Sequence, residues 1–154
     1  MKIRPFDPSD TEAVVALWND CGLVRPWNDP LKDIQRKLTV QPELFLVGVG
    51  DSAPSSKVGG VGDSTPGSEV VGSVMVGFDG HRGWVNYLAV SPSHRGHGHG
   101  RAFMAEAERL LIGIGCPKLN LQVRAGNESV LAFYDALGYQ PDHTVSLGKR
   151  LIAD

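Results

Sequence analysis

Three glycines stand at every second position between two arginines in the run Arg95-Gly96-His97-Gly98-His99-Gly100-Arg101. The run follows an apolar, β-branched stretch and precedes a stretch with helical periodicity, so its backbone N–H groups should lie at a helix N-terminus. Such a terminus binds anions, because its N–H groups lack intrahelical partners and the helix dipole adds positive charge. Glycine lets the main chain approach a pyrophosphate closely, and the two arginines can add charge-assisted hydrogen bonds. A flexible glycine turn between strand and helix is the plainer interpretation.

Two common phosphate-binding patterns do not fit this chain. A dinucleotide site requires G-x-G-x-x-G and an acidic residue about 20 positions later, whereas the spacing here is G-x-G-x-G and residues 119–123 read Leu-Asn-Leu-Gln-Val. The segment Gly59-Gly60-Val61-Gly62 lacks the following Lys and Ser/Thr of a P-loop. A dinucleotide-binding oxidoreductase is therefore the weaker rival interpretation.

Two amphipathic helices are predicted in the first part of the chain. Ser9 and Glu12 have the spacing of a capping box that would begin the first helix. Its apolar face comprises Val14, Leu17, Trp18 and Cys21, and Gly22 would end it. Asp29-Pro30 begins the second helix, because proline suits the first helical position. The apolar stripe of that helix comprises Leu31, Ile34 and Leu38.

Strands and helices alternate along the rest of the chain. After a short apolar start at residues 3–6, strands are predicted over residues 44–49, 69–78, 84–90, 119–123 and 145–151. Helices are predicted over 101–114 and 127–137, the first with Phe103, Ala107, Leu110, Leu111 and Ile114 on one face. The order predicts an α/β fold with a mixed central sheet, an antiparallel N-terminal meander and helices on both faces.

The composition indicates one globular domain over residues 1–154, with 42% hydrophobic and 21% charged residues. The net charge of −2 does not indicate the basic surface that binding to nucleic acid or an anionic membrane requires. No apolar run approaches the ~20 residues of a membrane span, and no signal-peptide core is seen, so we expect a cytoplasmic protein. Residues 50–68 hold five Gly, five Ser and two Pro and predict a mobile hairpin loop. We consider a homodimer as one arrangement of the protein, but the sequence leaves the oligomeric state open.

Two separated motifs resemble those of the GNAT superfamily of N-acetyltransferases. Leu88-Ala89-Val90 followed by Arg95-x-x-Gly98-x-Gly100 looks like the acetyl-CoA signature of that family. Asn127, Tyr134 seven residues later, and then Leu137-Gly138-Tyr139 look like its second diagnostic segment. The resemblance implies a single-domain GNAT fold, acetyl-CoA as cosubstrate, and acetyl transfer to a primary amine of a small molecule, peptide or protein. A CoA-binding sensor or interaction module without catalysis is the alternative.

Four further segments resemble a subgroup of small bacterial members, the YpeA-type acetyltransferases. They are residues 25–30, 79–83, 115–118 and 146–151. No particular acceptor follows from that likeness.

The resemblance also implies residue roles on the cofactor side. The backbone of Leu88, Ala89 and Val90 would hold the pantetheine arm and form an oxyanion hole for the thioester carbonyl. The loop residues Arg95, Gly96, His97, Gly98, His99, Gly100 and Arg101 would hold the pyrophosphate. Asn127 would contact the cofactor, although it is also a good helix N-cap. Tyr134 would protonate the leaving thiolate, although it could equally be a packed aromatic beside Phe133.

The acceptor side is less defined. Residues 84–88 contain no carboxylate where relatives often have a glutamate, so Asp79, His81, a water relay or direct attack by a free amine all remain as routes for the proton. The acceptor pocket would be bordered by Arg25, Trp27, Asn28, Asp79, His81 and Tyr87. Trp27 could instead cover the core.

The histidines His81, His94, His97 and His99 could suggest a metal site. No Cys, Asp or Glu partner stands near the loop histidines, and the loop amides are needed for the anion. We therefore expect no metal, with these rings bonding or stacking near the phosphates and adenine.

Overall fold

The computed structural model describes residues 1–50 and 69–153 of the chain. Except for Gly50, the predicted loop at residues 50–68 lies outside the described residues. The strands are β1 (Lys2–Pro5), β2 (Phe45–Val49), β3 (Val70–Phe78), β4 (Gly83–Val90) and β5 (Leu119–Leu121). The helices are α1 (Thr11–Asp20), α2 (Pro30–Leu38), α3 (His99–Gly113) and α4 (Glu128–Asp135), with short 3₁₀ turns at Pro8–Asp10, Pro42–Leu44 and Pro92–His94.

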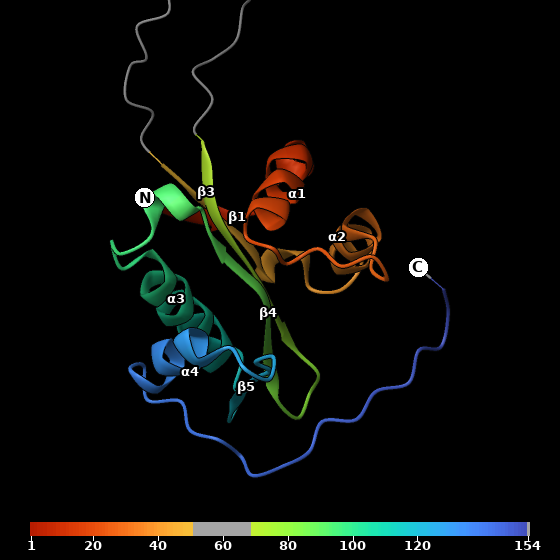
Figure 1. Cartoon of the computed structure of the whole chain (residues 1–154), viewed down its shortest axis with the longest axis vertical. Coiled ribbons are helices and arrows are strands. Elements are labelled where there is room, and N and C mark those ends of the chain that lie inside the picture. Colours follow the sequence, from red (N-terminus) through yellow and green to blue (C-terminus); the bar gives the residue numbers. More distant parts are fainter. Residues whose placement is uncertain (51–68, 154) are drawn as a thin grey trace, which may run out of the picture.

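The five strands form one mixed sheet in the order β1-β2-β3-β4-β5. The first four pair antiparallel, and β4 pairs parallel with β5. Figure 1 shows α1 and α2 on one face of this sheet and α3 and α4 on the other. The predicted mixed α/β architecture is confirmed. No helix in residues 1–50 or 69–153 is long and apolar enough to cross a membrane.

Each face of the sheet has its own apolar core. The α1 and α2 face buries Val14, Trp18 and Ile34 against Phe45, and the α3 face buries Phe103 and Met104 against the other side of the strands. The predicted helical faces were right in their centres and wrong at two edges. Leu31, in the first turn of α2, is 48% exposed, and Ile114, the C-cap residue of α3, is 49% exposed.

The first helix begins differently from the predicted capping box. Asp7 caps the 3₁₀ turn that precedes α1: its side chain accepts from the backbone N–H of Ser9, and the Asp10 carboxylate accepts from the backbone N–H of Asp7 at 2.8 Å. The N-cap of α1 itself is Asp10, not Ser9, and its side chain makes no cap bond to α1. Asp10 is also paired with Arg4 at 2.7 Å. The 3₁₀ turn at Pro8–Asp10 moves the capping box two residues toward the N-terminus, and α1 follows it.

Two paired glycines allow α3 to lie very close to the sheet. Gly48 on β2 faces Gly72 on β3, and the Phe103 ring of α3 lies over both. A Cβ at Gly72 would be 2.5 Å from Phe103 Cε2 and 2.9 Å from the carbonyl oxygen of Ala89. Because these sites have no side chain, α3 and the loop before it are held close to the end of β4.

The prediction of a last strand at 145–151 is wrong for the single chain. The described residues 139–151 have no regular secondary structure, and residues 141–153 are all exposed. A strand needs a ladder partner, and within the described residues only β4 pairs with β5. The segment 145–151 therefore has strand propensity but no partner strand among the described residues.

Candidate active site

A bulge in β4 lies at the centre of the candidate site. Ser73 on β3 faces Ala89, whereas Met75, two residues on, faces Asn86, so β4 carries one residue more than its partner. The bulge falls at Tyr87, which has a φ of 52°. This left-handed conformation is rare for a bulky residue and marks a position that its surroundings must hold in place.

Three contacts hold Tyr87 in that conformation. Its ring stacks on Trp18 of α1, with ring centroids 4.0 Å apart. Its hydroxyl donates to Asp33 Oδ2 of α2 at 2.6 Å. Its carbonyl accepts from the buried Ser73 hydroxyl at 3.4 Å. The bulge is thus fixed from the α1 and α2 face.

Beyond the bulge, β4 separates from β5. The parallel ladder ends at Val85 and Leu121. The Ser91 N–H donates to Val71 of β3 at 2.8 Å, so the preceding Val90 turns its backbone groups to the opposite, open edge. Its carbonyl there accepts from Arg95 Nε at 3.1 Å and Cys21 Sγ at 3.4 Å. By the same alternation Leu88 faces the open edge, whereas Ala89 is buried and paired with Ser73.

The glycine loop leads directly from this open edge into α3. Gly96 and Gly98 have φ values of 78° and 76°, in the left-handed region that favours glycine. Gly98 is the N-cap of α3, and no side chain caps the helix. The first N–H groups, from His99 to Arg101, therefore form an anion-binding terminus. Arg101 is exposed in this first turn.

The third glycine of the loop has another role. A Cβ at Gly100 would lie 3.1 Å from Phe133 Cζ of α4. This glycine therefore permits α3 and α4 to approach each other, and it sets how near the neighbouring Tyr134 lies to the loop.

The rings of the loop histidines lie near one another but have different surroundings. The His99 ring lies 6.0 Å from that of His97 and 6.4 Å from that of His94. His97 Nδ1 is 2.8 Å from the Arg95 carbonyl. Burial lowers the pKa of His99, and the charges of the N-terminus, His97 and His94 lower it further. Among the described residues no group of three or more His, Cys, Asp or Glu side chains is placed to hold a metal.

Tyr134 lies on α4, on the same sheet face as α3. Its ring contacts those of Phe133 and Tyr139 edge-on, at 5.0 and 5.7 Å. Burial raises its pKa to about 12, so the phenol is protonated throughout the physiological range. Within the described residues its hydroxyl has no hydrogen-bond partner, which leaves the proton for a bound molecule. Asn127 takes the N-cap position of α4 without a side-chain cap bond, and its Oδ1 accepts from Ser129.

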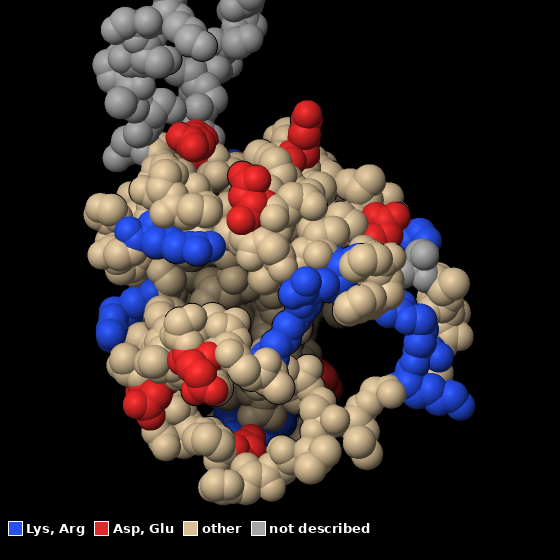
Figure 2. Space-filling model, in the orientation of Figure 1, with Lys and Arg blue, Asp and Glu red and all other residues tan. Residues whose placement is uncertain are grey.

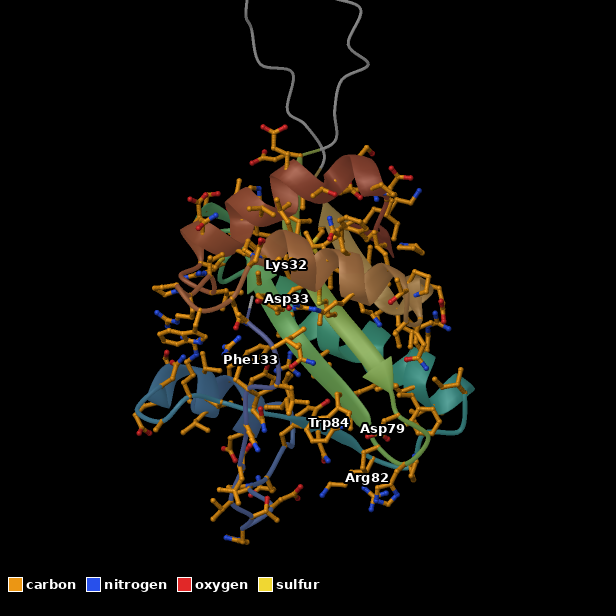
Figure 3. The ribbon with its side chains drawn as sticks, turned by 90° about the vertical axis from the view of Figure 1, so that its right-hand side faces the viewer. Lys32, Asp33, Asp79, Arg82, Trp84 and Phe133 are labelled. Carbon is orange, nitrogen blue, oxygen red and sulfur yellow. The ribbon has the colours of Figure 1, made fainter. Side chains whose placement is uncertain are left out.

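Asp79 and His81 lie in the β3–β4 turn, at the other end of β4 from the glycine loop. The Asp79 carboxylate accepts from the backbone of His81 and Arg82 and from Trp84 Nε1 at 3.0 Å. These bonds lower its pKa to about 2, which makes it a weak base. Figure 3 shows Asp79, Arg82 and Trp84 together at this turn, apart from Asp33 on α2.

The loop between α1 and α2 carries the other residues predicted for the acceptor. Trp27 is 61% exposed, so it does not cover the core. Arg25 Nε is buried and has no hydrogen-bond partner among the described residues. Asn28 Oδ1 accepts a hydrogen bond from Arg150 Nη2 at 3.3 Å. The structure thus brings Arg25, Asn28 and Tyr87 to one side of the sheet and leaves Asp79 and His81 at the turn.

Asp33 is a candidate residue on this side of the sheet that the sequence did not indicate. It lies on α2 beside Tyr87 and Arg36, and its Oδ1 accepts a hydrogen bond from Arg36 Nη1 at 2.9 Å. The signal was weak: an acidic residue in the first turn of a helix is ordinary. Asp33 becomes a candidate only in the folded structure, because the bulge in β4 turns the Tyr87 hydroxyl toward its carboxylate.

Comparisons with known proteins agree with this geometry. The sequence model of the acetyltransferase (GNAT) family matches residues 12–139. An acetyltransferase of Yersinia enterocolitica is 48% identical over 154 residues, which are 100% of this chain and 98% of the relative.

Solved structures share the fold at lower identity. The NatC complex bound to Gag peptide and CoA aligns with a TM-score of 0.70 at 22% identity, covering 89% of this chain and 84% of that one. The aminoglycoside antibiotic 6′-N-acetyltransferase of Acinetobacter haemolyticus aligns with a TM-score of 0.69 at 16% identity, covering 99% of both chains. The family match over residues 12–139 and the 48% identity to the Yersinia enterocolitica acetyltransferase establish that the chain belongs to the GNAT family of acetyltransferases.

Proposed function

We propose that this protein transfers an acetyl group from acetyl-CoA directly to a primary amine. The observation that carries the proposal is the open edge of β4, which ends beside the uncapped N-terminus of α3. A strand edge with unpaired amides and a helix terminus that binds anions are what an extended thioester with a pyrophosphate requires. The NatC structure, which shares the fold and is bound to CoA, supports this choice of donor.

The donor would lie across the α3 end of the sheet. The pyrophosphate would take the N–H groups of the first α3 turn, with Arg101 beside them. Arg95 now bonds Val90 and would have to turn toward the phosphates. The pantetheine arm would follow the backbone of residues 88–90, with Asn127 at the start of α4 on its other side.

The acetyl transfer itself balances without a further reagent. The neutral amine attacks the thioester carbonyl carbon, and the C–S bond breaks as the tetrahedral intermediate collapses. The N–H groups of Leu88 and Val90 would hold the oxyanion, which is the step where fixed donors contribute most. The amine loses one proton, and the CoA thiolate gains one.

Tyr134 would act on the leaving thiolate as a hydrogen-bond donor. Its pKa of about 12 lies well above the value of about 8.5 for an ordinary thiol, so complete transfer of the proton to a free thiolate is uphill. A strong hydrogen bond to the developing negative charge needs no such transfer. We therefore expect a modest contribution to the rate.

The acceptor would approach from the α1 and α2 face, opposite Tyr134. On that side the Asp33 carboxylate, held by Tyr87, supplies the negative charge that residues 84–88 lack. It would orient an ammonium group of the acceptor or accept its proton through water. Asp79 is the weaker candidate, because its hydrogen bonds lower its pKa to about 2 and because it lies in the β3–β4 turn, at the other end of β4 from the glycine loop.

The proposal is tested by a screen of amines for release of free CoA thiol. The amines include polyamines, amino acids, aminoglycosides and peptides with free N-termini, because neighbours of this fold are named for both antibiotic and peptide substrates. Thiol release with one class, reduced in Tyr134→Phe and in Asp33→Asn, is the expected result. Thermal stabilisation by CoA with no thiol release from any amine would favour the non-catalytic alternative.

A further inference from the structure

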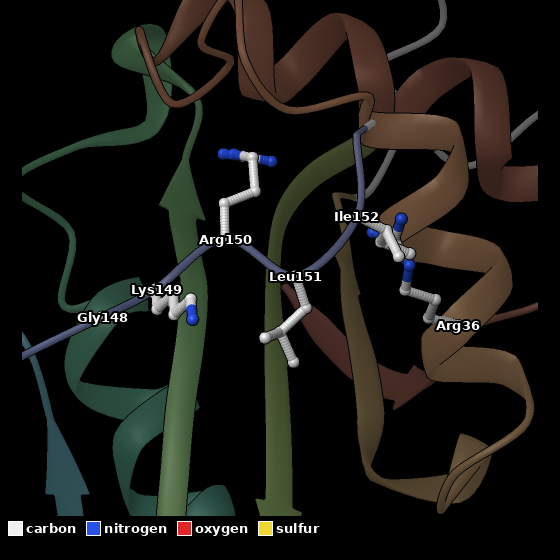
Figure 4. A pocket seen from close by; sticks show the side chains of 6 residues that line it. All are labelled: Arg36, Gly148, Lys149, Arg150, Leu151 and Ile152. Atoms are coloured by element: carbon white, nitrogen blue, oxygen red, sulfur yellow. The ribbon is translucent and has the colours of Figure 1, made fainter.

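An open cavity lies between α2 and the segment 148–152, on the side of the sheet from which the acceptor would approach. It has a volume of about 560 Å³ and is lined by Arg36, Gly148, Lys149, Arg150, Leu151 and Ile152. Figure 4 shows the segment crossing in front of β4 and β3, with Arg36 of α2 beside Ile152. Cavities of this size bind small molecules.

The charged side chains that line this cavity are all cationic. Arg36, Lys149 and Arg150 line it, and no Asp or Glu is among its lining residues. Arg36 is bonded to Asp33, whereas Lys149 and Arg150 form no ion pair with a carboxylate in residues 1–50 and 69–153. In Figure 2, Lys and Arg side chains border the hollow on this face. Since like charges repel, a bound anion would lower the electrostatic energy of the cavity.

Hydrogen bonds connect this cavity to Asp33. Arg150 Nη2 donates to Asn28 Oδ1 at 3.3 Å, and Asn28 Nδ2 donates to Asp33 Oδ2 at 3.5 Å. The same carboxylate oxygen accepts from the Tyr87 hydroxyl at 2.6 Å. The carboxylate that would meet the amine and the cationic cavity are therefore linked through one asparagine side chain.

A further guanidinium lies in the loop that carries Asn28. The Asn28 N–H donates to the Arg25 carbonyl at 3.0 Å, which closes a turn between the two residues. Arg25 Nε is buried and has no hydrogen-bond partner among the described residues. A buried donor of this kind needs an acceptor, so Arg25 also favours an anionic group on this side of the sheet.

We propose that the acceptor is a small amine that also carries an acidic group, either a carboxylate or a phosphate; this inference rests on the proposed function. Asp33 binds the amine, and Lys149 and Arg150 bind the acidic group through charge-assisted hydrogen bonds. Leu151 and Ile152 line the same cavity and supply apolar contacts for the carbon chain between the two groups. A polyamine fits poorly, because its second ammonium group would enter the cavity beside the cations.

The first test compares amines that differ in the acidic group. Lysine is paired with lysinamide, and phosphoethanolamine is paired with ethanolamine. The kcat/KM for release of CoA thiol should be about 10-fold higher for the acidic member of at least one pair, which is the usual effect of one hydrogen bond between charged groups. The pair that responds distinguishes a carboxylate from a phosphate. An equal or faster reaction of the member without the acidic group in both pairs would overturn the inference.

A binding measurement separates this inference from the proposed function. Calorimetry of the same two pairs with the protein–CoA complex requires no acetyl transfer. An acidic member should bind about 10-fold more tightly than its partner at low salt, and the difference should shrink as the ionic strength rises. Equal affinities within both pairs would overturn the inference, even if other amines release thiol. An absence of thiol release from every amine, with the difference in affinity preserved, would contradict the proposed function and support the binding site.

Two variants test where the acidic group binds. Lys149→Gln and Arg150→Gln should each raise the KM for the acidic amine, or its Kd in calorimetry, by about 10-fold. The values for the partner without the acidic group and for acetyl-CoA should not change. Arg109→Gln is the matched control, because Arg109 is an exposed arginine of α3, on the other face of the sheet, and it should leave all these values unchanged. An equal loss for both members of a pair, or no loss in either cavity variant, would show that the cavity does not bind the acidic group.

Discussion

At the scale of single residues, the proposed site divides its work between the two faces of the sheet. Tyr134 faces the side of α3 and α4, and the Asp33–Tyr87 pair faces the side of α1 and α2. The thioester would lie between them, where β4 and β5 part. This arrangement lets a proton donor and a carboxylate act on one carbonyl group without neutralising each other.

Replacing Tyr134 by Phe should lower kcat by about 10- to 100-fold, which corresponds to one hydrogen bond to a charged group. The KM for acetyl-CoA should change little, because the ring and its packing stay. Steady-state rates over pH 6–10 check this. Since the pKa of Tyr134 is raised to about 12, its phenol stays protonated in this range and the rate should only rise as the amine loses its proton. A fall in rate near pH 9 that disappears in the Phe variant would contradict the assignment.

His99 offers a test of where the phosphates lie. Burial lowers its pKa in the unliganded protein, so its imidazole is largely neutral at pH 7. A bound phosphate would favour the charged form and raise that pKa, so CoA should bind with proton uptake and more tightly as the pH falls. Titration of the imidazole resonances by NMR, with and without CoA, measures the change. The ring resonances of His81, at the other end of β4, should not move when CoA binds.

At the scale of elements, the sequence predicted which segments are helices or strands better than it predicted how those elements bend and meet. The helical stripes and the apolar strands are local patterns, and β2, β3, β4, α1 and α3 follow from them. The bulge at Tyr87 could not be predicted, because its cause is a set of contacts with Trp18, Ser73 and Asp33 that are distant in sequence.

The strand predicted at 145–151 failed for a related reason. Apolar, β-branched composition gives a segment the propensity to pair, but a partner edge decides whether it does. The cofactor loop was easier to recognise, since its glycines and the following helix are contiguous. The separate roles of Gly98 and Gly100 emerged only from the contact of α3 with Phe133.

Gly72→Ala tests the close approach of α3 to the sheet. The added Cβ would meet the Phe103 ring and the Ala89 carbonyl, and overpacking of this kind costs about 1–3 kcal/mol. Thermal unfolding should therefore shift to lower temperature. Gly77→Ala is the control on the same strand, because its Cβ would find only Gln41 Oε1 at 3.7 Å. Equal unfolding temperatures for the two variants would contradict the packing argument.

At the scale of the whole molecule, the donor would bind across three parts of the chain at once. The first turn of α3, the open edge of β4 and the start of α4 belong to separate segments of the chain. A ligand that contacts all three binds only the folded state, so it must stabilise folding as a whole.

CoA at about 100 times its Kd should stabilise the fold by about 2.7 kcal/mol, which raises Tm by about 5–11 °C for a chain of this size. Tyr134→Phe should keep this shift, because it removes one hydroxyl and leaves the phosphate site intact. Gly98→Ala should lose most of it, because a φ of 76° is strained for alanine and relaxing it turns the α3 amides away from the phosphates. Gly113→Ala is the matched control in the same helix, where a Cβ meets nothing within 4 Å. If Gly98→Ala kept the full shift while Gly113→Ala lost it, CoA would have to bind somewhere other than the start of α3.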